Sequence, residues 1–99
     1  MKLREIAFSR AGDKGAVNNV CVFPYDEANW ELIREKLSVE VVRGVFGPLV
    51  KGEITRYEYP RLKGLNFVMK DALEGGSTIN LRTDPHGKSY ANLILETDI

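Results

Sequence analysis

The sequence has very few of the residues that build metal centres and covalent cross-links. It contains one cysteine, Cys21, and one histidine, His86, among 99 residues. A single cysteine forms no intrachain disulfide, and a zinc site of cysteine and histidine ligands needs more of both. We therefore expect no bound metal, and we expect Cys21 to be a buried thiol of the core.

Long apolar runs and an excess of charge of either sign are also missing. No hydrophobic stretch approaches the roughly 20 residues that span a membrane, and the first residues lack an apolar signal segment. Lys and Arg together number 14, as do Asp and Glu, so the formal net charge is zero. Nucleic-acid-binding proteins usually carry a basic excess or a basic stripe. These absences predict a cytoplasmic protein that binds neither membranes nor nucleic acids. Zero net charge also removes one obstacle to self-association.

What is present is typical of one globular domain over residues 1–99. Hydrophobic residues make up 43% of the chain and charged residues 28%, close to the averages for soluble proteins. The length matches the common size of a single domain and is sufficient for one core.

Periodicity predicts four strands and four helices. Alternation indicates strands at 3–9, 17–23, 53–59 and 78–83, and helical spacing indicates helices at 26–37, 38–49, 62–73 and 89–95. Asp26 and Ser38 are suitable N-caps for the first two helices. The second strand is almost continuously apolar, which indicates a strand covered on both faces. Residues 65–69 also match a strand, but the helical match around them is longer.

The order β-β-α-α-β-α-β-α predicts an α+β fold. Four strands are too few to close a barrel of ordinary width, so we expect the helices on one face of an open, mixed sheet. The helix between the third and fourth strands permits a right-handed crossover and parallel pairing there. We therefore expect a two-layer sandwich of ferredoxin-like type.

The first two predicted strands are joined by a long loop that contains two glycines. Gly12 and Gly15 permit positive φ and expose consecutive backbone N–H groups, which suit a carboxylate, a phosphate or a partner's chain. Arg10 and Lys14 would add cationic donors. Asp13 is a candidate general base, but it can equally accept the loop's own N–H groups in an Asx turn. Both a structural role and a binding role are open for this loop.

Several segments, in the right order along nearly the whole chain, resemble motifs of one family. Residues 10–15 with Asn19 resemble A-R-S-G-D-K-G-[DN]-x-x-N, and residues 52–58 resemble G-x-V-x-R-Y-E. Leu65-Asn66-Phe67 followed by residues 72–76 resembles L-N-F-x-x-x-x-A-L-G-G-G. These are motifs of the carboxy-terminal domain of AtuA-type (acyclic terpene utilisation) proteins. Ala11, Ala16 and Glu74 depart from the family's serine, Asp or Asn, and glycine, which puts in doubt any chemistry those positions carry.

The resemblance implies a ferredoxin-like fold and a part in the catabolism of branched or terpenoid acyl compounds, handled as CoA thioesters. The domain is usually fused behind a larger one, and we expect a stand-alone version here. The resulting hypothesis is a non-catalytic small subunit that binds a larger AtuA-type protein, assembles with itself, or does both. Tyr25, Tyr57 and Tyr59 are candidate anchors of the interface.

The alternative hypothesis is an enzyme, or an active-site contributor, that binds an acyl-CoA or a carboxylate through the Gly-Asp-Lys-Gly loop. No cofactor is expected beyond a CoA thioester as ligand, and Asp13 and Lys14 are the candidate catalytic groups. A small-molecule sensor is a third hypothesis, by analogy of fold. The candidate ligand- or partner-binding residues are Arg10, Gly12, Asp13, Lys14, Gly15, Asn19, Gly75 and Gly76.

Overall fold

The computed structural model describes residues 1–14, 17–47, 50, 52–70 and 88–99. Within these ranges the chain forms four strands, three α-helices and two short 3-10 helices. In chain order they are η1 (Leu3–Glu5), β1 (Ala7–Lys14), β2 (Val17–Pro24), η2 (Glu27–Asn29), α1 (Trp30–Lys36), α2 (Val39–Phe46), β3 (Ile54–Tyr59), β4 (Gly64–Lys70) and α4 (Lys88–Ile94).

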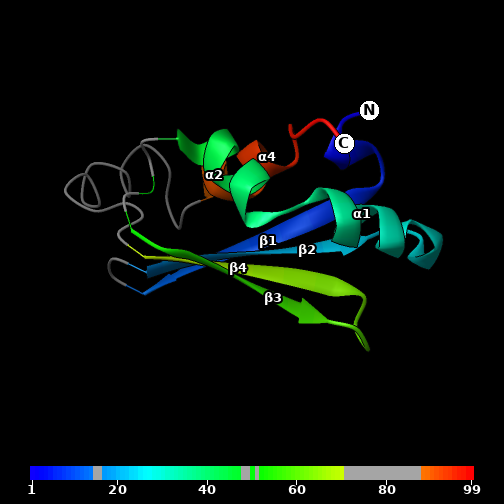
Figure 1. The fold of residues 1–99 in the computed structure, drawn as a ribbon, viewed down its shortest axis with the longest axis horizontal. Coiled ribbons are helices and arrows are strands. Elements are labelled where there is room, and N and C mark those ends of the chain that lie inside the picture. The colour runs from blue at the N-terminus through cyan, green and yellow to red at the C-terminus, as the bar shows by residue number, and fades with distance from the viewer. Residues whose placement is uncertain (15–16, 48–49, 51, 71–87) are drawn as a thin grey trace.

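The four strands form one sheet in the order β1-β2-β4-β3, and all three pairings are antiparallel. The helices α1, α2 and α4 lie on one side of this sheet (Figure 1). The described part of the chain therefore has two layers, with one sheet face covered by helices and the opposite face uncovered. The predicted α+β sandwich is confirmed, and its described strands all pair antiparallel.

The core lies between the two layers because the central strands alternate between them. Every second residue of β2 and β4 is buried on the covered face, which is the period-2 pattern of a half-covered strand. The apolar side chains buried there come from both layers: Val20, Val22, Leu65, Phe67 and Met69 of the sheet, and Ile33, Leu37, Val42, Phe46 and Ile94 of the helical layer. The expectation that β2 is covered on both faces is wrong, because the described helices all lie on one side.

The helices begin and end at the residues that local chemistry favours. The Asp26 carboxylate accepts a hydrogen bond from the Ala28 N–H at 2.9 Å at the start of η2, which leads into α1. The Ser38 hydroxyl accepts one from the Val41 N–H at 3.2 Å at the start of α2. The Ser38 N-cap of α2 is confirmed, whereas Asp26 caps η2, and the N-cap residue of α1 is Asn29, which makes no side-chain capping hydrogen bond. Among the described residues, no helix has the length and apolar character needed to cross a membrane.

The segment Gly64–Lys70 is a strand, so the predicted helix at 62–73 is wrong for these residues. The strand pairs with β2 on one side and with β3 on the other, and a short turn at residues 60–63 joins it to β3. β3 and β4 pair antiparallel because this turn reverses the chain without a helical crossover. The expected parallel pairing involves the predicted strand at 78–83 and stays a prediction. The predicted strand at 78–83 lies outside the described residues.

The start of the chain also differs from the prediction. Residues 3–5 form η1, and β1 begins only at Ala7 but continues to Lys14. The expected loop at 10–16 is therefore mostly strand: Arg10 pairs with Cys21, and Gly12 pairs with Asn19. Gly12 does not adopt a positive φ, so the conformational freedom expected of it in a loop is not used in this strand.

The two ends of the chain meet at the edge of the helical layer, as Figure 1 shows. Lys2 and Asp98 form an antiparallel bridge, and the Ile99 N–H donates to the Met1 carbonyl at 2.9 Å. The Leu3 N–H donates to the Thr97 carbonyl at 2.8 Å. Residues 1–3 and 97–99 therefore hold each other in place.

Candidate functional site

Three predicted binding residues, Arg10, Gly12 and Asn19, lie on the uncovered face of the sheet. On β1, the Ser9 hydroxyl donates to the Ala91 carbonyl of α4 at 2.7 Å, so Ser9 faces the helices. Adjacent residues of a strand point to opposite faces. Arg10 and Gly12 therefore face away from the helices, as does Asn19 opposite Gly12 on β2.

The other predicted binding residues are placed less completely. Asp13 and Lys14 are the last residues of β1, with backbone partners Asn18 and Val17 on β2. Gly15, Gly75 and Gly76 lie outside the described residues, so their part in an anion cradle stays a prediction.

Strand register aligns a row of side chains across the uncovered face. Arg10 of β1 pairs with Cys21 of β2, Cys21 with Asn66 of β4, and Asn66 with Tyr57 of β3. Neighbouring strands lie about 4.8 Å apart, so the row crosses the whole sheet. We call these four residues, together with Asn19, the polar row.

Hydrogen bonds link the polar row to Tyr59. The Asn19 amide NH2 donates to the Asn66 amide oxygen at 3.3 Å, and the Asn66 NH2 donates to the Tyr59 hydroxyl at 3.2 Å. The Asn19 NH2 also lies 3.7 Å from the Cys21 sulfur. A Cβ added to Gly12 would come within 3.0 Å of the Asn19 amide oxygen, so glycine leaves room for that amide. The side chains are held in place before any ligand binds.

Cys21 sits half-buried in the middle of the polar row. Burial raises the pKa of its thiol, while the Asn19 hydrogen bond and the positive charge of Arg10 oppose that shift. A thiol with a raised pKa is protonated at neutral pH and is a weak nucleophile. The expectation of a buried core thiol is wrong, because the alternation of β2 directs Val20 and Val22 to the core and Cys21 to the opposite face.

Arg10 has an exposed side chain that makes no hydrogen bond or ion pair with any residue in the described ranges. Several other arginines are engaged: for example, Arg43 donates to the carbonyls of Val50 and Gly52, and Arg4 pairs with Glu96. A guanidinium offers five donors in a planar fork that fits a carboxylate. Arg10 is therefore an available anion-binding group on the strands of this face.

An aromatic cluster lies at one end of the same face. The rings of Phe8 and Phe23 are stacked with centroids 5.5 Å apart, and the Phe8 and Tyr25 centroids are 5.4 Å apart. A Cβ added to Gly64 would come within 2.5 Å of the Phe23 ring, so that ring lies against the bare Gly64 backbone. Phe8 is 38% exposed and Tyr25 69% exposed. We call Phe8, Phe23, Tyr25, Tyr59 and Leu62 the aromatic end.

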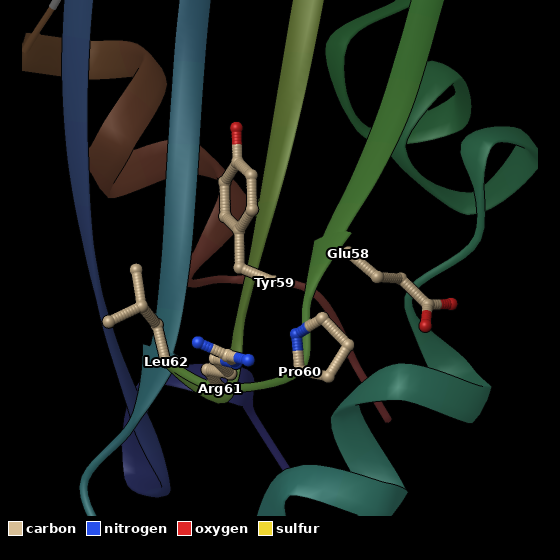
Figure 2. Close-up of a pocket in the computed structure, with 5 residues that line it drawn as sticks. All are labelled: Glu58, Tyr59, Pro60, Arg61 and Leu62. Carbon is tan, nitrogen blue, oxygen red and sulfur yellow. The ribbon is translucent and has the colours of Figure 1, made fainter.

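A hollow of about 480 Å³ opens beside the turn between β3 and β4, lined by residues 58–62. In Figure 2 the side chains of Tyr59 and Leu62 lie over the strands, and Glu58 points away from them. Tyr59 pairs with Gly64 at this end of the sheet, whereas Lys14 pairs with Val17 at the other. The structure therefore does not bring the hollow to the predicted Gly-Asp-Lys-Gly segment.

One buried polar group lies on the covered face near that segment. Asn18 is fully buried, and its side-chain amide has no hydrogen-bond partner among the described residues. Its neighbours in the sheet are Asp13 on β1 and Met69 on β4. An unpaired buried amide is unfavourable for stability.

Sequence reasoning located part of this surface. It identified Arg10, Gly12 and Asn19 as binding residues, and Tyr25, Tyr57 and Tyr59 as interface anchors; the structure places all six on or beside the uncovered face. It missed Asn66, because residues 62–73 matched a helix, and it missed Phe8 and Phe23. Strict alternation within 64–70 was the signal that could have found Asn66.

Two layers, four antiparallel strands and helices on one face define an α+β sandwich of ferredoxin-like type. A family model, the AtuA ferredoxin-like domain, matches residues 1–99, and the chain belongs to that family. The resemblance inferred from the motifs is confirmed. No curated protein and no solved structure matches the chain significantly.

Proposed function

We propose that this chain is a non-catalytic small subunit that docks the uncovered face of its sheet onto a larger AtuA-type protein. That protein would act on branched or terpenoid acyl compounds, handled as CoA thioesters. We also propose a cytoplasmic location. Cytoplasmic proteins are seldom stabilised by disulfides, and this chain, with one cysteine, can form none within itself.

One observation carries the proposal: residues of the family motifs divide into two groups with different positions. Arg56 and Glu58 of the R-Y-E motif form an ion pair at 2.7 Å on the covered side, where they serve the fold. Arg10, Asn19, Tyr57 and Asn66 instead line the uncovered face.

The composition of that face supports docking. Tyrosine, phenylalanine and arginine are the residue types that dominate binding energy at protein interfaces. Tyr57 and Tyr59 are neighbours on this face of β3 and are 48% and 37% exposed, and contiguous exposed apolar groups of this kind mark interaction sites on monomeric proteins. The raised pKa of Cys21 argues against a nucleophile here, which favours binding over catalysis.

Co-purification tests the proposal directly. A tagged chain is expressed together with a larger AtuA-type protein from the same organism, and we expect the two to elute as one complex. Tyr57→Ala should weaken the affinity about tenfold, whereas Glu40→Ala, on the helical layer, should leave it unchanged. Cys21 is the chain's single cysteine, so its alkylation by iodoacetamide, followed by mass spectrometry of this chain, should slow in the complex. A wild-type chain that stays monomeric beside the larger protein would exclude the proposal.

A second candidate, binding of an acyl-CoA or a carboxylate with or without catalysis, is favoured by the unpaired Arg10. Binding to the native state alone raises the melting temperature, so a CoA thioester should stabilise the isolated chain. The enzymatic form of this candidate requires that Asp13→Ala or Lys14→Ala reduce turnover of the complex. Unchanged turnover in both variants rules that form out.

A further inference from the structure

The uncovered face is cationic although the whole chain is neutral. Among the strand residues of this face whose side chains the structure describes, Arg10 and Lys70 are charged, and none is a carboxylate. The Lys70 ammonium lies 3.9 Å from a Glu53 oxygen just before β3. Arg61 lines the hollow. The described charged groups of this face that have no carboxylate partner, Arg10 and Arg61, are therefore both positive.

Carboxylates of the described residues are gathered elsewhere. Glu58 pairs with Arg56 on the covered side, and Glu31 pairs with Arg34 on α1. Asp98 pairs with Lys2 where the chain ends meet. A partner that approaches the uncovered face thus meets a positive field, which favours an acidic surface.

The hydrogen-bond direction within the polar row adds to this preference. Asn19 donates to Asn66, and Asn66 donates to the Tyr59 hydroxyl oxygen. Tyr59 therefore accepts from inside the protein, and its own O–H proton is free to donate outward. The Arg10 guanidinium on β1 and the Tyr59 hydroxyl on β3 are therefore hydrogen-bond donors that face outward. Cys21 and Asn66, on the two central strands, lie between them.

We propose that Arg10 binds an aspartate or glutamate side chain of the larger AtuA-type protein, and that an apolar side chain beside that carboxylate packs on the aromatic end. The proposal rests on the subunit function proposed above and specifies the partner's chemistry. A carboxylate fits the guanidinium through two parallel N–H···O bonds. The exposed rings of Phe8 and Tyr25 then supply the apolar contact next to it.

Two other occupants are less compatible with the charges on this face. A second copy docked face to face would offer Arg10 no carboxylate from the described strand side chains of this face. A nucleic acid needs several phosphate contacts, whereas the strand side chains that the structure describes on this face include two cations, Arg10 and a lysine paired with Glu53. The observations therefore favour an acidic protein surface.

The test measures the affinity of the larger AtuA-type protein for four forms of this chain by titration calorimetry. They are the wild type, Arg10→Gln, Arg10→Lys and, as a charge-matched control on the exposed end of α1, Lys36→Gln. We expect Arg10→Gln to weaken binding about 30-fold or more. Arg10→Lys should fall in between, because an ammonium does not form the bidentate pair. Lys36→Gln should change affinity less than twofold. Affinity should also fall with NaCl more steeply for the wild type than for Arg10→Gln.

The outcomes separate this inference from the proposed function. If the wild type binds and Tyr57→Ala weakens the complex while Arg10→Gln does not, docking stands and the carboxylate contact is wrong. If the wild type does not bind at all, the subunit function itself fails. Arg10-dependent binding of acetate or a CoA thioester that displaces the larger protein would assign the carboxylate to a small molecule instead. Arg10-dependent binding of a single-stranded oligonucleotide, or a dimer that Arg10→Gln stabilises, would likewise overturn the inference.

Discussion

Two glycines occupy very different surroundings in this chain. A Cβ at Gly64 would come within 2.5 Å of the Phe23 ring, whereas a Cβ at Gly44 in α2 would meet nothing within 4 Å. We expect Gly64→Ala to lower the free energy of unfolding by about 1–3 kcal/mol, because the ring must move. Gly44→Ala should raise it by about 0.5–1 kcal/mol through helix propensity. Urea unfolding of both variants checks this pair, and equal effects would contradict it.

The buried amide of Asn18 is expected to reduce stability. It has no hydrogen-bond partner among the described residues, so Asn18→Leu, of similar shape, should raise the free energy of unfolding by about 1–2 kcal/mol. Thr97 is the matched control: it is also buried, but its hydroxyl donates to the Ile94 carbonyl at 2.6 Å. Thr97→Val should therefore be destabilising. A destabilised Asn18→Leu variant would mean that the amide has a hydrogen-bond partner outside the described residues.

Cys21 makes stability depend on pH in a definite direction. Burial raises the pKa of this thiol in the folded chain, so the unfolded chain, with a thiol pKa of about 8.5, loses the proton first. The stabilisation is full below the unfolded pKa and is lost as pH rises through the folded pKa. Urea unfolding of the wild type and Cys21→Ala between pH 7 and 10 should show the wild type losing more stability.

The Arg10→Gln variant tests how the positive charge of Arg10 affects the pKa of the Cys21 thiol. The positive charge of Arg10 lowers the pKa of Cys21, so its removal should raise that pKa further and slow alkylation by iodoacetamide at pH 8. Faster alkylation in Arg10→Gln would show that Arg10 shields the thiol rather than stabilising its thiolate.

At the scale of elements, Arg56 joins β3 to the end of α1. Its guanidinium donates to the Leu37 carbonyl at 3.0 Å and to the Arg34 carbonyl at 2.6 Å, and these are among the carbonyls that a helix leaves unpaired at its end. We expect Arg56→Ala to lower the free energy of unfolding by about 2–4 kcal/mol, since charged hydrogen bonds are lost at a partly buried site. Arg34→Ala, which removes an exposed pair with Glu31, should cost clearly less. Chemical denaturation of the two variants compares them.

The elements predicted correctly from the sequence are those whose sequence pattern lies within a few neighbouring residues. The N-caps at Asp26 and Ser38 act on the next helical turn, and the alternation of 54–59 is local to β3. The segment 64–70 failed because its apolar residues fit both a helix and a strand. Its strand state depends on pairing with β2, more than 40 residues earlier, which no local pattern contains.

The same limit applied to the candidate site. Arg10 and Asn19 were identified because they lie in one short motif, but their alignment with Asn66 and Tyr57 depends on the register of three strand pairs. Glycines in 10–16 suggested a loop, whereas the ladder with β2 extends the strand through Gly12 to Lys14. Residues from distant segments become one surface only after the sheet has formed.

At the scale of the whole molecule, stability should be greatest in the middle of the sheet. β2 and β4 are paired on both sides, while β1 and β3 are each paired on one side within the described sheet. Amides buried and paired in this way exchange only through large unfolding events. We expect the amides of Val20, Val22, Leu65 and Phe67 to exchange slowest in hydrogen–deuterium exchange. Slower exchange in β3 of the isolated chain would contradict this order.

The meeting of the chain ends has a practical consequence. Because Ile99 donates to the carbonyl of Met1 and Asp98 bridges Lys2, a host loop could accommodate this module with little separation of its two attachment points. Closely spaced ends are what make domain insertion and circular permutation tolerable in other proteins. The domain is thus suited to insertion into a loop of another protein. After such an insertion, the polar row and the aromatic end would still be exposed on the side away from the helices.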